Sequence, residues 1–374
     1  MKTRILFVID GIEFGGGERG FAQIVNGLPE SRYETFLASG PQETFYHAVS
    51  NSSVQRHTVD FSNRCNPSVL IDLIRIIRNN RINIVHGQGA RADFYARLAS
   101  GFSRKTMYVS TVQMPVEGYD VGLMTMLLYR AFDRFSERFV DRFLVVSSVL
   151  EQTMIQGHGI PREKVVKIYN GIETDHYKPH DQEVGRRRVR QEYSVNEGEI
   201  LIGSLGRLVW QKGFEYFLQS IAILIRDIPE ARFMLVGEGP LRKELEEQAR
   251  SLGIHDRLFF TGHRNDIRDM MAAMDIIVIP SLLEGFPMIT MEAMAMEKPI
   301  VTTAIDGITE QIRDGMEGQL VAPKSPLALA QAVKRLVDDP GYARSLGINA
   351  RAKVVRDFSV RKMIAETIKV YETL

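Results

Sequence analysis

Short apolar runs alternate with helical stretches along almost the whole chain. Runs of four to six apolar residues are separated by stretches in which apolar residues recur at helical spacing. This alternation is typical of βαβ units built around parallel sheets. We therefore predict an α/β protein, with strands near residues 4–9, 33–38, 83–86, 107–111, 143–146, 165–168, 200–203, 232–236, 258–261 and 276–279.

The alternation is interrupted once, after Tyr177-Lys178-Pro179. A polar, arginine-rich stretch extends from there to Arg190, and strand–helix alternation restarts at Ile200. This change in composition predicts a linker, and 374 residues exceed what one hydrophobic core usually serves. We predict an N-terminal domain of residues 1–180, joined by a last helix at about 357–374, and a C-terminal domain of residues 181–356.

The net charge and the cysteine content exclude several classes of protein. Forty-seven basic and 46 acidic residues leave a net charge of +1, which argues against nucleic-acid binding through bulk charge. The single cysteine, Cys65, has no internal disulfide partner, and no Cys/His cluster has zinc spacing. No apolar run approaches the roughly 18 residues of a membrane span. We expect a cytoplasmic protein with at most peripheral contact at the inner face of the membrane.

Three consecutive glycines follow the first predicted strand, in Gly15-Gly16-Gly17-Glu18. Glycines there allow a ligand to approach the backbone, although the G-x-G-x-x-G spacing of a dinucleotide site is absent and an ordinary turn is the alternative. His86 and Gln113 follow later strands on the same sheet edge. Because ligands in open α/β sheets bind beyond the carboxyl ends of strands, we favour ligand contact there. For His86, structural hydrogen bonding is the alternative.

A helix predicted over about residues 122–141 carries arginines at every fourth position and phenylalanines at helical spacing. These residues are Arg130, Arg134, Arg138, Arg142, Phe132, Phe135, Phe139 and Phe143. One interpretation is a basic, aromatic helix lying on an anionic membrane. The other is a solvated helix in which Asp133, Glu137 and Asp141 pair with the arginines and the phenylalanines are core. We favour the salt-bridged helix.

Two cations follow the first strand of the second domain. Arg207 and Lys212 lie between Gly206 and Gly213, at a strand end and before a helix. A diphosphate needs fixed cations as well as N–H donors, so this arrangement suits one. Solvated loop cations are the alternative. Glu238 and Arg264 follow the next strands, where a base or a ribose could bind or where turn chemistry alone operates.

The stretch from Pro280 to Pro299 combines a strand end, a turn at Gly285 and the start of a helix. Free backbone N–H groups and the positive end of the helix converge there, which favours anion binding. Glu284 and Glu292 flank that position. Either glutamate alone is more often a cap or a solvated residue, but the combined pattern predicts a binding site.

Taken together, these motifs resemble the retaining glycosyltransferases of family 4, which have the GT-B fold. The matching motifs are Gly15-Gly16-Gly17-Glu18, Asn170-Gly171-Ile172, Gly206-Arg207 with Lys212-Gly213, Gly237-Glu238-Gly239-Pro240, and Glu284-Gly285-Phe286-Pro287 with Glu292. They occur in the family's order and cover nearly the whole chain. The resemblance implies two Rossmann-like domains facing a cleft, with a C-terminal helix that crosses back to the N-terminal domain.

The resemblance also implies roles for individual residues. Arg207 and Lys212 are expected to bind the diphosphate and stabilise charge on the leaving nucleotide. Glu284 is expected to contact the donor sugar, and Glu292 the ribose hydroxyls. The other expected donor contacts are Gly16, Gly17, Gln113, Gly206, Glu238, Arg264, Phe286, Met288 and Ile289, and His86 and Glu18 are candidates for sugar or acceptor contact.

The sequence departs from the family at one position of this set. Many members carry histidine in a Thr-x-His pattern, whereas this chain reads Thr111-Val112-Gln113. Glutamine can hydrogen-bond a sugar hydroxyl but cannot titrate, so an acid–base role there is in doubt.

The function implied is glycosyl transfer from a nucleotide diphosphate sugar to an acceptor hydroxyl, with retention and without a metal or other cofactor. We favour a UDP-sugar over a GDP- or ADP-sugar. We expect an acceptor that is a saccharide or lipid-linked, in synthesis of a cell-envelope glycan or glycolipid, and no nucleic-acid partner. The alternatives are a nucleotide-sugar epimerase or hydrolase on the same fold, and a non-catalytic partner subunit.

Overall fold

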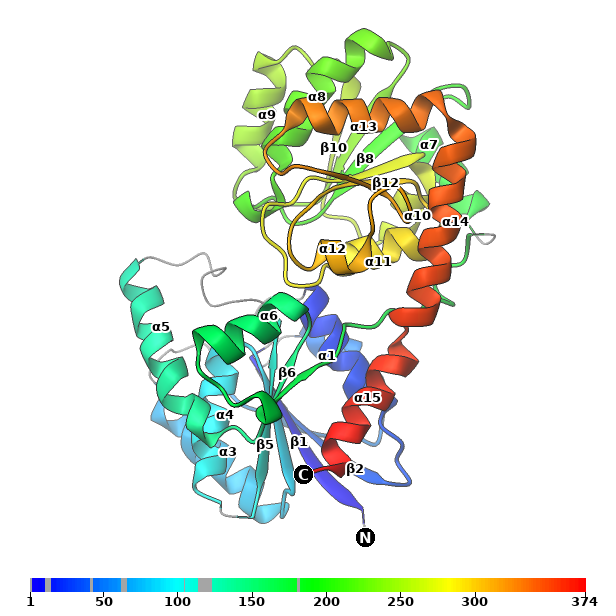
Figure 1. The fold of residues 1–374 in the computed structure, drawn as a ribbon. Coiled ribbons are helices and arrows are strands. Elements are labelled where there is room, and N and C mark those ends of the chain that lie inside the picture. The colour runs from blue at the N-terminus through cyan, green and yellow to red at the C-terminus, as the bar shows by residue number, and fades with distance from the viewer. Residues whose placement is uncertain are drawn as a thin grey trace. The chain divides into compact units, whose positions relative to one another are not determined.

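The computed structural model describes residues 2–10, 15–40, 43–61, 66–103, 105–113, 123–179 and 182–374. The chain forms two compact units. The N-terminal unit comprises Met1–Gly171 and Val360–Leu374, and the C-terminal unit comprises Ile172–Ser359 (Figure 1). In the described part of the chain, no helix is long and apolar enough to cross a membrane.

The N-terminal unit is built on a parallel seven-stranded sheet in the order β3-β2-β1-β4-β5-β6-β7. Its strands are β1 (Thr3–Ile9), β2 (Tyr33–Ser39), β3 (Gln55–Thr58), β4 (Ile84–Gln88), β5 (Met107–Val112), β6 (Arg142–Val145) and β7 (Val165–Lys167). Its helices are α1 (Gly16–Gly27), α2 (Glu43–Ala48), α3 (Pro67–Asn79), α4 (Ala90–Gly101), α5 (Leu123–Ser136), α6 (Ser148–Gln152) and α15 (Val360–Glu372).

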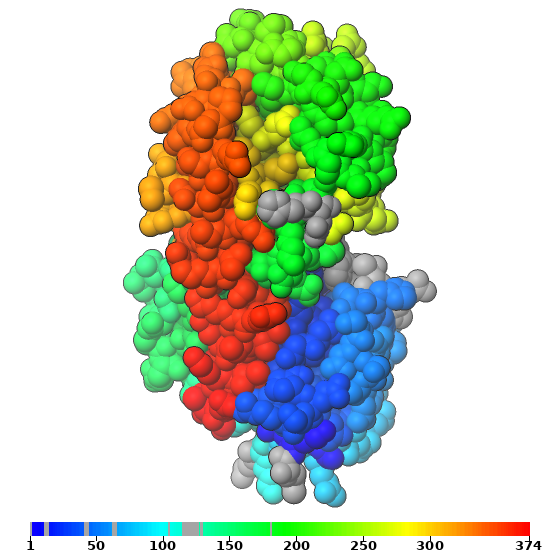
Figure 2. Space-filling model, turned by 90° about the vertical axis from the view of Figure 1, so that its right-hand side faces the viewer, coloured from blue at the N-terminus to red at the C-terminus, as the bar shows by residue number. Residues whose placement is uncertain are grey.

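The last helix, α15, belongs to the N-terminal unit and packs beside α1. Met363, Val370 and Tyr371 of α15 join the hydrophobic core formed by β1 and α1. Gly27 lies so close to Ile364 that an added Cβ would stand 2.1 Å from its Cδ1 atom. Figure 2 shows α15, in red, lying beside α1, in blue. The predicted return of the C-terminal helix is confirmed.

The C-terminal unit has a parallel six-stranded sheet in the order β10-β9-β8-β11-β12-β13. Its strands are β8 (Leu201–Leu205), β9 (Arg232–Val236), β10 (Leu258–Gly262), β11 (Ile276–Ile279), β12 (Ile300–Thr303) and β13 (Gln319–Val321). Its helices are α7 (Glu183–Glu192), α8 (Phe214–Asp227), α9 (Arg242–Ser251), α10 (Ile267–Ala273), α11 (Met288–Ala295), α12 (Ile308–Gln311), α13 (Pro326–Asp338) and α14 (Pro340–Asp357).

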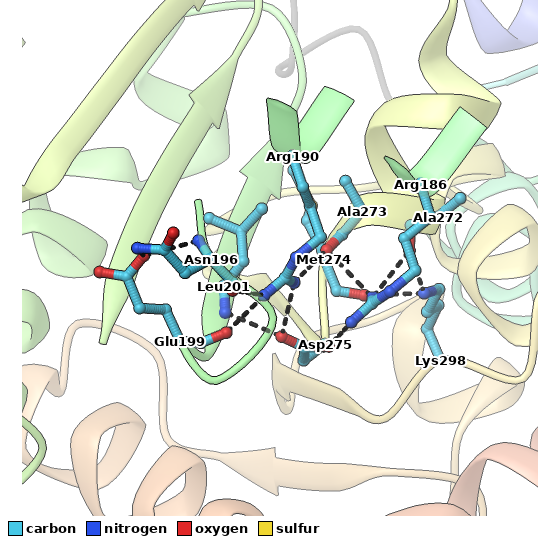
Figure 3. Close-up of polar contacts among 10 residues, drawn as sticks. All are labelled: Arg186, Arg190, Asn196, Glu199, Leu201, Ala272, Ala273, Met274, Asp275 and Lys298. Atoms are coloured by element: carbon cyan, nitrogen blue, oxygen red, sulfur yellow. Dashed lines mark hydrogen bonds and ion pairs between the residues drawn. The ribbon is translucent and has the colours of Figure 1, made fainter. Parts of the chain in front are cut away.

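The arginine-rich stretch predicted as a linker is instead helix α7, packed on α10. Arg186 and Arg190 donate to carbonyl oxygens at the C-terminus of α10, and both pair with Asp275, at 2.8 and 3.1 Å (Figure 3). Cations placed there satisfy orphan carbonyls and complement the helix dipole. The prediction was wrong because the pairing groups lie about 85 residues away in the sequence.

The two predicted Rossmann-like α/β sheets are confirmed, with three strands beyond those predicted. β12 and β13 lie on one side of the second sheet, and β3 is the edge strand of the first. The sequence of β3, QRHT, lacks an apolar run because an edge strand can face solvent.

Both sheets reverse their strand order at one point. In the N-terminal unit the reversal falls between β1 and β4, and in the C-terminal unit between β8 and β11. Ligands of open α/β sheets bind beyond the carboxyl ends of strands at such a reversal. A ligand is therefore expected at the loops that follow these four strands.

Candidate functional site

The loop after β8 is fixed by backbone contacts with the turn after β9. Gly206 N–H donates to Val236 O at 2.9 Å, and Leu208 N–H donates to Glu238 O at 2.8 Å. Gly237 has a φ of +140°, and a Cβ added there would lie 1.9 Å from Gly206 O. Only glycine permits this approach, so the two loops hold each other in place.

The same loop is locked to the loop after β11. Gly213 adopts a left-handed conformation (φ +62°), and a Cβ added to it would stand 2.3 Å from Pro280 O. Leu282 N–H donates to Gln211 O at 2.7 Å. The two loops that flank the reversal in strand order thus form one rigid surface.

Side chains of these two loops meet in an ion pair. Lys212 Nζ lies 2.5 Å from Glu284 Oε1, and the Ser281 hydroxyl donates to the same oxygen at 2.8 Å. Both charged groups are partly buried, so solvent screens the pair less than a surface pair. The structure therefore brings together two of the three predicted catalytic residues. The third, Arg207, lies exposed in the same loop.

Helix α11 begins directly after this loop. Its N-terminus carries no side-chain cap, and Pro287 precedes the first helical residues, Met288 and Ile289. Phe286 is buried and packs edge-on against Phe358, with 5.2 Å between ring centroids. Uncapped N–H groups at a helix start suit an anion, as the sequence predicted for this position.

Glu292 lies in the second turn of α11 and is only 3% exposed. The Tyr177 hydroxyl donates to its Oε1 atom at 2.9 Å. The carboxylate is therefore held in one orientation by a residue from the segment that precedes α7. Its predicted contact with a ribose stays a prediction.

A cavity of about 260 Å³ adjoins Glu284. Leu282, Leu283, Ala304, Ile305 and Asp306 complete its lining. A second cavity, of about 490 Å³, lies at the opposite edge of the sheet, where Asp275 and Pro299 precede strands β11 and β12. The smaller cavity, not the larger one, adjoins the carboxyl ends of the strands.

The larger cavity is lined in part by the polar cluster shown in Figure 3. Lys298 donates to the carbonyl oxygens of Ala272 and Met274, at 2.8 and 2.7 Å. Burial, together with the nearby Arg186, lowers the pKa of Lys298 to about 7. These groups fasten the end of α10 and are remote from the predicted site residues.

Arg264 does not offer a free cation to a ligand. It forms paired hydrogen bonds with Asp266, both at 2.8 Å, and with Glu192, at 2.6 and 3.0 Å. Its hydrogen bonds to the Asp266 and Glu192 carboxylates raise the pKa of Arg264 above its ordinary value. In this structure Arg264 thus links α7 to α10, and its predicted donor contact stays a prediction. Glu238, also a predicted contact, is half-exposed and pairs with Arg242 at 3.1 Å.

In the N-terminal unit, Gly16 and Gly17 open helix α1, as predicted for a ligand-binding turn. Glu18 accepts a hydrogen bond from Gly15 N–H at 2.9 Å, so it caps its own helix in this structure. Residues 11–14 of the same loop lie outside the described residues. The contacts predicted for Gly16, Gly17 and Glu18 stay predictions.

Gln113 belongs to a cluster of three side-chain amides beneath the start of α1. It donates to Gln88 at 3.1 Å, and Asn170 donates to it at 2.9 Å. Gly17 lies directly above, since a Cβ added there would be 3.2 Å from Gln113 Cγ. A cluster of neutral amide side chains thus occupies the position at which many family members carry a titratable histidine.

His86 is a core residue and not a ligand contact. Strand β4 continues to Gln88, so His86 lies within the strand instead of beyond its end. Its ring nitrogens contact Thr111 Oγ1 at 2.6 Å and Tyr371 Oη at 2.5 Å. Burial lowers its pKa to about 3, and no ring atom is exposed to a sugar.

The predicted acid-paired helix is borne out only in part. Arg134 lies 3.5 Å from Glu137, but Asp133 pairs with the buried Arg97 of α4. Phe132 and Phe135, expected in the core, are each 50% exposed. Asp133, Glu137 and His158 lie close enough to share a cation, yet Arg97 and Arg134 already neutralise the carboxylates.

The sequence did not predict the residues that orient the candidate ligand-binding side chains. Ser281 orients Glu284, Tyr177 orients Glu292, and Gln88 orients Gln113. Tyr177 and Glu292 are 115 positions apart, so no local pattern connects them. Ser281, three residues before Glu284, is a signal that local reading could have used.

Two family models match the chain in succession. The model described as "Glycosyltransferase Family 4" matches residues 14–176, and the model described as "Glycosyl transferases group 1" matches residues 185–353. Between them, the models account for most of both units.

Curated relatives are glycosyltransferases of several kinds. An uncharacterized glycosyltransferase of Methanocaldococcus jannaschii is 29% identical over 231 residues, which are 61% of this chain and 59% of that protein. The alpha-D-kanosaminyltransferase of Streptomyces kanamyceticus is 29% identical over 220 residues, 58% of this chain and 56% of that enzyme. The matched region thus spans less than two thirds of these two relatives.

A further relative is matched over more of its length. The UDP-Gal:alpha-D-GlcNAc-diphosphoundecaprenol alpha-1,3-galactosyltransferase of Escherichia coli is 23% identical over 306 residues, 81% of this chain and 78% of that enzyme.

Solved structures share the fold at low sequence identity. Anabaena HepE in complex with UDP-glucose superposes with a TM-score of 0.86 at 22% identity, covering 99% of this chain and 100% of that one. WaaG, a glycosyltransferase involved in lipopolysaccharide biosynthesis, gives a TM-score of 0.76 at 18% identity, covering 97% and 98%. With the two family models, these likenesses show that the chain belongs to the family 4 glycosyltransferases and has the GT-B fold.

Proposed function

We propose that this protein transfers a sugar from a nucleotide diphosphate sugar to an acceptor hydroxyl, with the anomeric configuration retained. The observation that carries the proposal is the locked pair of loops after β8 and β11. It places Lys212, Glu284 and the uncapped start of α11 on one rigid surface at the reversal in strand order.

The cations of this surface act on the leaving group. The bond between the anomeric carbon and the diphosphate oxygen breaks, and negative charge grows on the diphosphate. Arg207 and Lys212 supply positive charge, and α11 supplies N–H donors. Because these groups are already in place, they stabilise the growing charge without reorganisation during the reaction.

Glu284 acts as a ligand of the donor sugar. Its Oε1 atom already accepts from both Lys212 and Ser281, so the carboxylate is held in one orientation. A carboxylate engaged in this way is a weak nucleophile but a good acceptor for a sugar hydroxyl. The cavity beside Glu284 is lined by leucine and isoleucine side chains and offers space for the ring.

Glu292 binds the ribose of the nucleotide. It is buried at the base of α11, and Tyr177 fixes one of its oxygens. An oriented, buried carboxylate accepts hydrogen bonds from two neighbouring hydroxyls of a ribose. Glu292 follows Met288 by four residues, so it lies about one helical turn from the N-terminus of α11.

We propose a UDP-sugar as donor and a lipid-linked or saccharide acceptor of a cell-envelope glycan. The name of the Escherichia coli relative specifies a UDP-sugar donor and a diphosphoundecaprenol acceptor. The HepE structures contain UDP or UDP-glucose. The two cations provide charge stabilisation that a metal provides in other transferases, so we expect turnover to persist in a chelator.

The proposal is tested first by donor binding and then by turnover. A thermal-shift screen of UDP-, GDP- and ADP-sugars should show the largest rise in melting temperature with a UDP-sugar. With that donor, Arg207→Ala and Lys212→Ala should each lower transfer to an acceptor by at least about a hundredfold. Lys243→Ala and Arg250→Ala, which remove exposed cations of α9, are the matched controls.

Three results would contradict this assignment. Near-normal turnover in both loop variants removes the phosphate role of Arg207 and Lys212. Rapid donor hydrolysis or an epimeric product, equally fast without acceptor, indicates a hydrolase or an epimerase. Absence of any shift with every donor indicates a chain that keeps the fold without the activity.

A further inference from the structure

The cavity beside Glu284 contains a second carboxylate, that of Asp306. Asp306 lies in the loop after β12 and lines the cavity together with Glu284. Its side chain is exposed, and in the described part of the chain it has neither a hydrogen bond nor an ion pair. The carboxylate of Asp306 is therefore free to interact with a molecule in the cavity.

The loop that carries Asp306 is held against the loop of Glu284 by a close backbone contact. Gly307 has a φ of +79°, and a Cβ added to it would lie 2.1 Å from Gly285 O and 3.3 Å from Glu284 O. Only glycine combines this conformation with this approach. The backbones at Glu284 and Asp306 are therefore held at a fixed separation.

Hydrogen bonds on both sides of the contact strengthen it. The Thr303 hydroxyl, at the end of β12, donates to Ser281 O. The Gln311 side-chain amide, at the end of α12, donates to Pro287 O at 3.0 Å. Figure 1 shows α12 beside α11. The wall of the cavity that follows β12 thus belongs to the same rigid surface as the loop of Glu284.

The described lining of the cavity has an excess of negative charge. Its ionisable residues are Glu284 and Asp306, and the others are the apolar Leu282, Leu283, Ala304 and Ile305. Lys212 pairs with Glu284 at 2.5 Å and balances its charge. No described cation pairs with Asp306, so one negative charge of the lining is not balanced.

We propose that Asp306 makes the donor site select sugars without negative charge and reject sugars that carry a carboxylate, such as a uronic acid. A carboxylate accepts hydrogen bonds, and a sugar hydroxyl donates one. A sugar carboxylate would instead bring a second negative charge close to Asp306, beside apolar walls that screen the repulsion poorly. This inference rests on the proposed function, because it takes the cavity as the site of the donor sugar.

A structural role is the alternative for Asp306. A carboxylate just before α12 (Ile308–Gln311) would complement the positive end of that helix. Loss of such a contribution changes the stability of the protein but affects all donors equally. The ratio of affinities for two donors therefore distinguishes selectivity from a structural role.

Two donors that differ in one group test the proposal. UDP-glucose carries a hydroxymethyl group where UDP-glucuronic acid carries a carboxylate. Calorimetric titration of the full-length protein should show UDP-glucuronic acid binding about tenfold or more weakly than UDP-glucose. Asp306→Asn removes the charge at nearly constant size and should reduce this difference to about twofold or less.

UDP alone and a distant aspartate provide the controls. The affinity for UDP, measured in each variant, accounts for any effect of the substitution on nucleotide binding, so that the ratio of the two donors reports the sugar alone. Asp256→Asn removes an exposed carboxylate just before β10, at the opposite edge of the sheet, and should leave the ratio at its wild-type value.

Three results would overturn the proposal. They are equal affinity of the wild-type protein for the two donors, a preference for UDP-glucuronic acid, and an unchanged ratio in Asp306→Asn. An unchanged ratio with an altered melting temperature would assign Asp306 a structural role. If UDP binds but the ratio does not respond, the inference about Asp306 fails and the proposed function stands. If UDP itself does not bind, both fail.

Discussion

At the scale of single residues, the side chains expected to touch a ligand are held by other side chains. Ser281 fixes Glu284, and Tyr177 fixes Glu292 through a buried hydrogen bond of 2.9 Å. Such supporting contacts orient a carboxylate before the ligand binds. Less side-chain conformational entropy is therefore lost on binding. Their loss should therefore affect affinity as well as stability.

Tyr177→Phe should weaken UDP binding by about tenfold, because one hydrogen bond to a buried carboxylate is worth about 1.5 kcal/mol. Tyr342→Phe is the matched control, since Tyr342 accepts a hydrogen bond from Gln319 at 2.8 Å, remote from the site. Calorimetric titration with UDP distinguishes the two. Equal affinity in the Tyr177 variant and the wild type would remove Tyr177 from the site.

His86 makes the stability of the N-terminal unit depend on pH. Its folded-state pKa is about 3, against 6.5 for the unperturbed ring, so only the unfolded chain takes up this proton between those values. Neutral, buried His86 therefore contributes fully to the free energy of unfolding above pH 6.5. Between pH 6.5 and about 3, this contribution falls by about 1.4 kcal/mol per pH unit. Acid should thus weaken the contact between β4 and Tyr371 of α15.

The measurement is the melting temperature of wild type and His86→Gln across the acid range. The variant should be less stable at neutral pH but should lose less stability on acidification. His47→Gln, at an exposed histidine, should follow the wild-type slope. Parallel slopes for wild type and His86→Gln would contradict the account of this residue.

The sequence predicted the residues that belong to a local loop motif. It did not predict contacts between residues that lie far apart in the chain. Lys212 and Glu284 were identified because each stands in a recognisable loop motif. The ion pair of Arg264 with Glu192 could not be predicted, because the two residues lie 72 positions apart. The predicted strand ends at His86, whereas β4 continues to Gln88, because Thr111 and Tyr371 hydrogen-bond the imidazole inside the core.

At the scale of elements, the loops at the strand ends depend on a few glycines that pack against backbone. Gly213 combines a positive φ with contact to Pro280, and it joins the phosphate-binding loop to the loop of Glu284. Any side chain at position 213 would clash with the backbone of Pro280 and force the two loops apart.

Gly213→Ala should destabilise the protein by about 3 kcal/mol and weaken UDP binding, because strain and displacement of the loop act together. Gly253→Ala is the control, since Gly253 has a φ of +68° with nothing within 4 Å of an added Cβ. It should cost only the backbone strain, about 1–2 kcal/mol, and leave UDP binding unchanged. Urea unfolding and titration measure both effects. Identical losses in the two variants would show that the contact with Pro280 contributes nothing.

Buried strands were predictable because their apolar runs reflect burial on both faces of a parallel sheet. The edge strand β3 and helix α7 were not. β3 is polar, and α7 is amphipathic only in the presence of Asp275 and the carbonyl oxygens of α10. In both cases the element depends on contacts with distant segments more than on its own composition.

At the scale of the whole molecule, two units with the same sheet architecture carry different chemistry. The N-terminal unit presents amides and the capped start of α1 at the reversal between β1 and β4, without a titrating group in the amide cluster. The C-terminal unit presents Arg207, Lys212 and two oriented carboxylates between β8 and β11. Strand–helix alternation predicted both sheets, and the order of motifs along the chain predicted the family.

The central claim is that the C-terminal unit binds the donor phosphates through Arg207 and Lys212. Isothermal titration of UDP into the full-length protein tests it most directly. We predict one site per chain and a loss of about tenfold to a hundredfold in affinity for Arg207→Ala and for Lys212→Ala, with no loss for Arg250→Ala. Unchanged affinity in both loop variants, or equal loss in the Arg250 control, would contradict the claim.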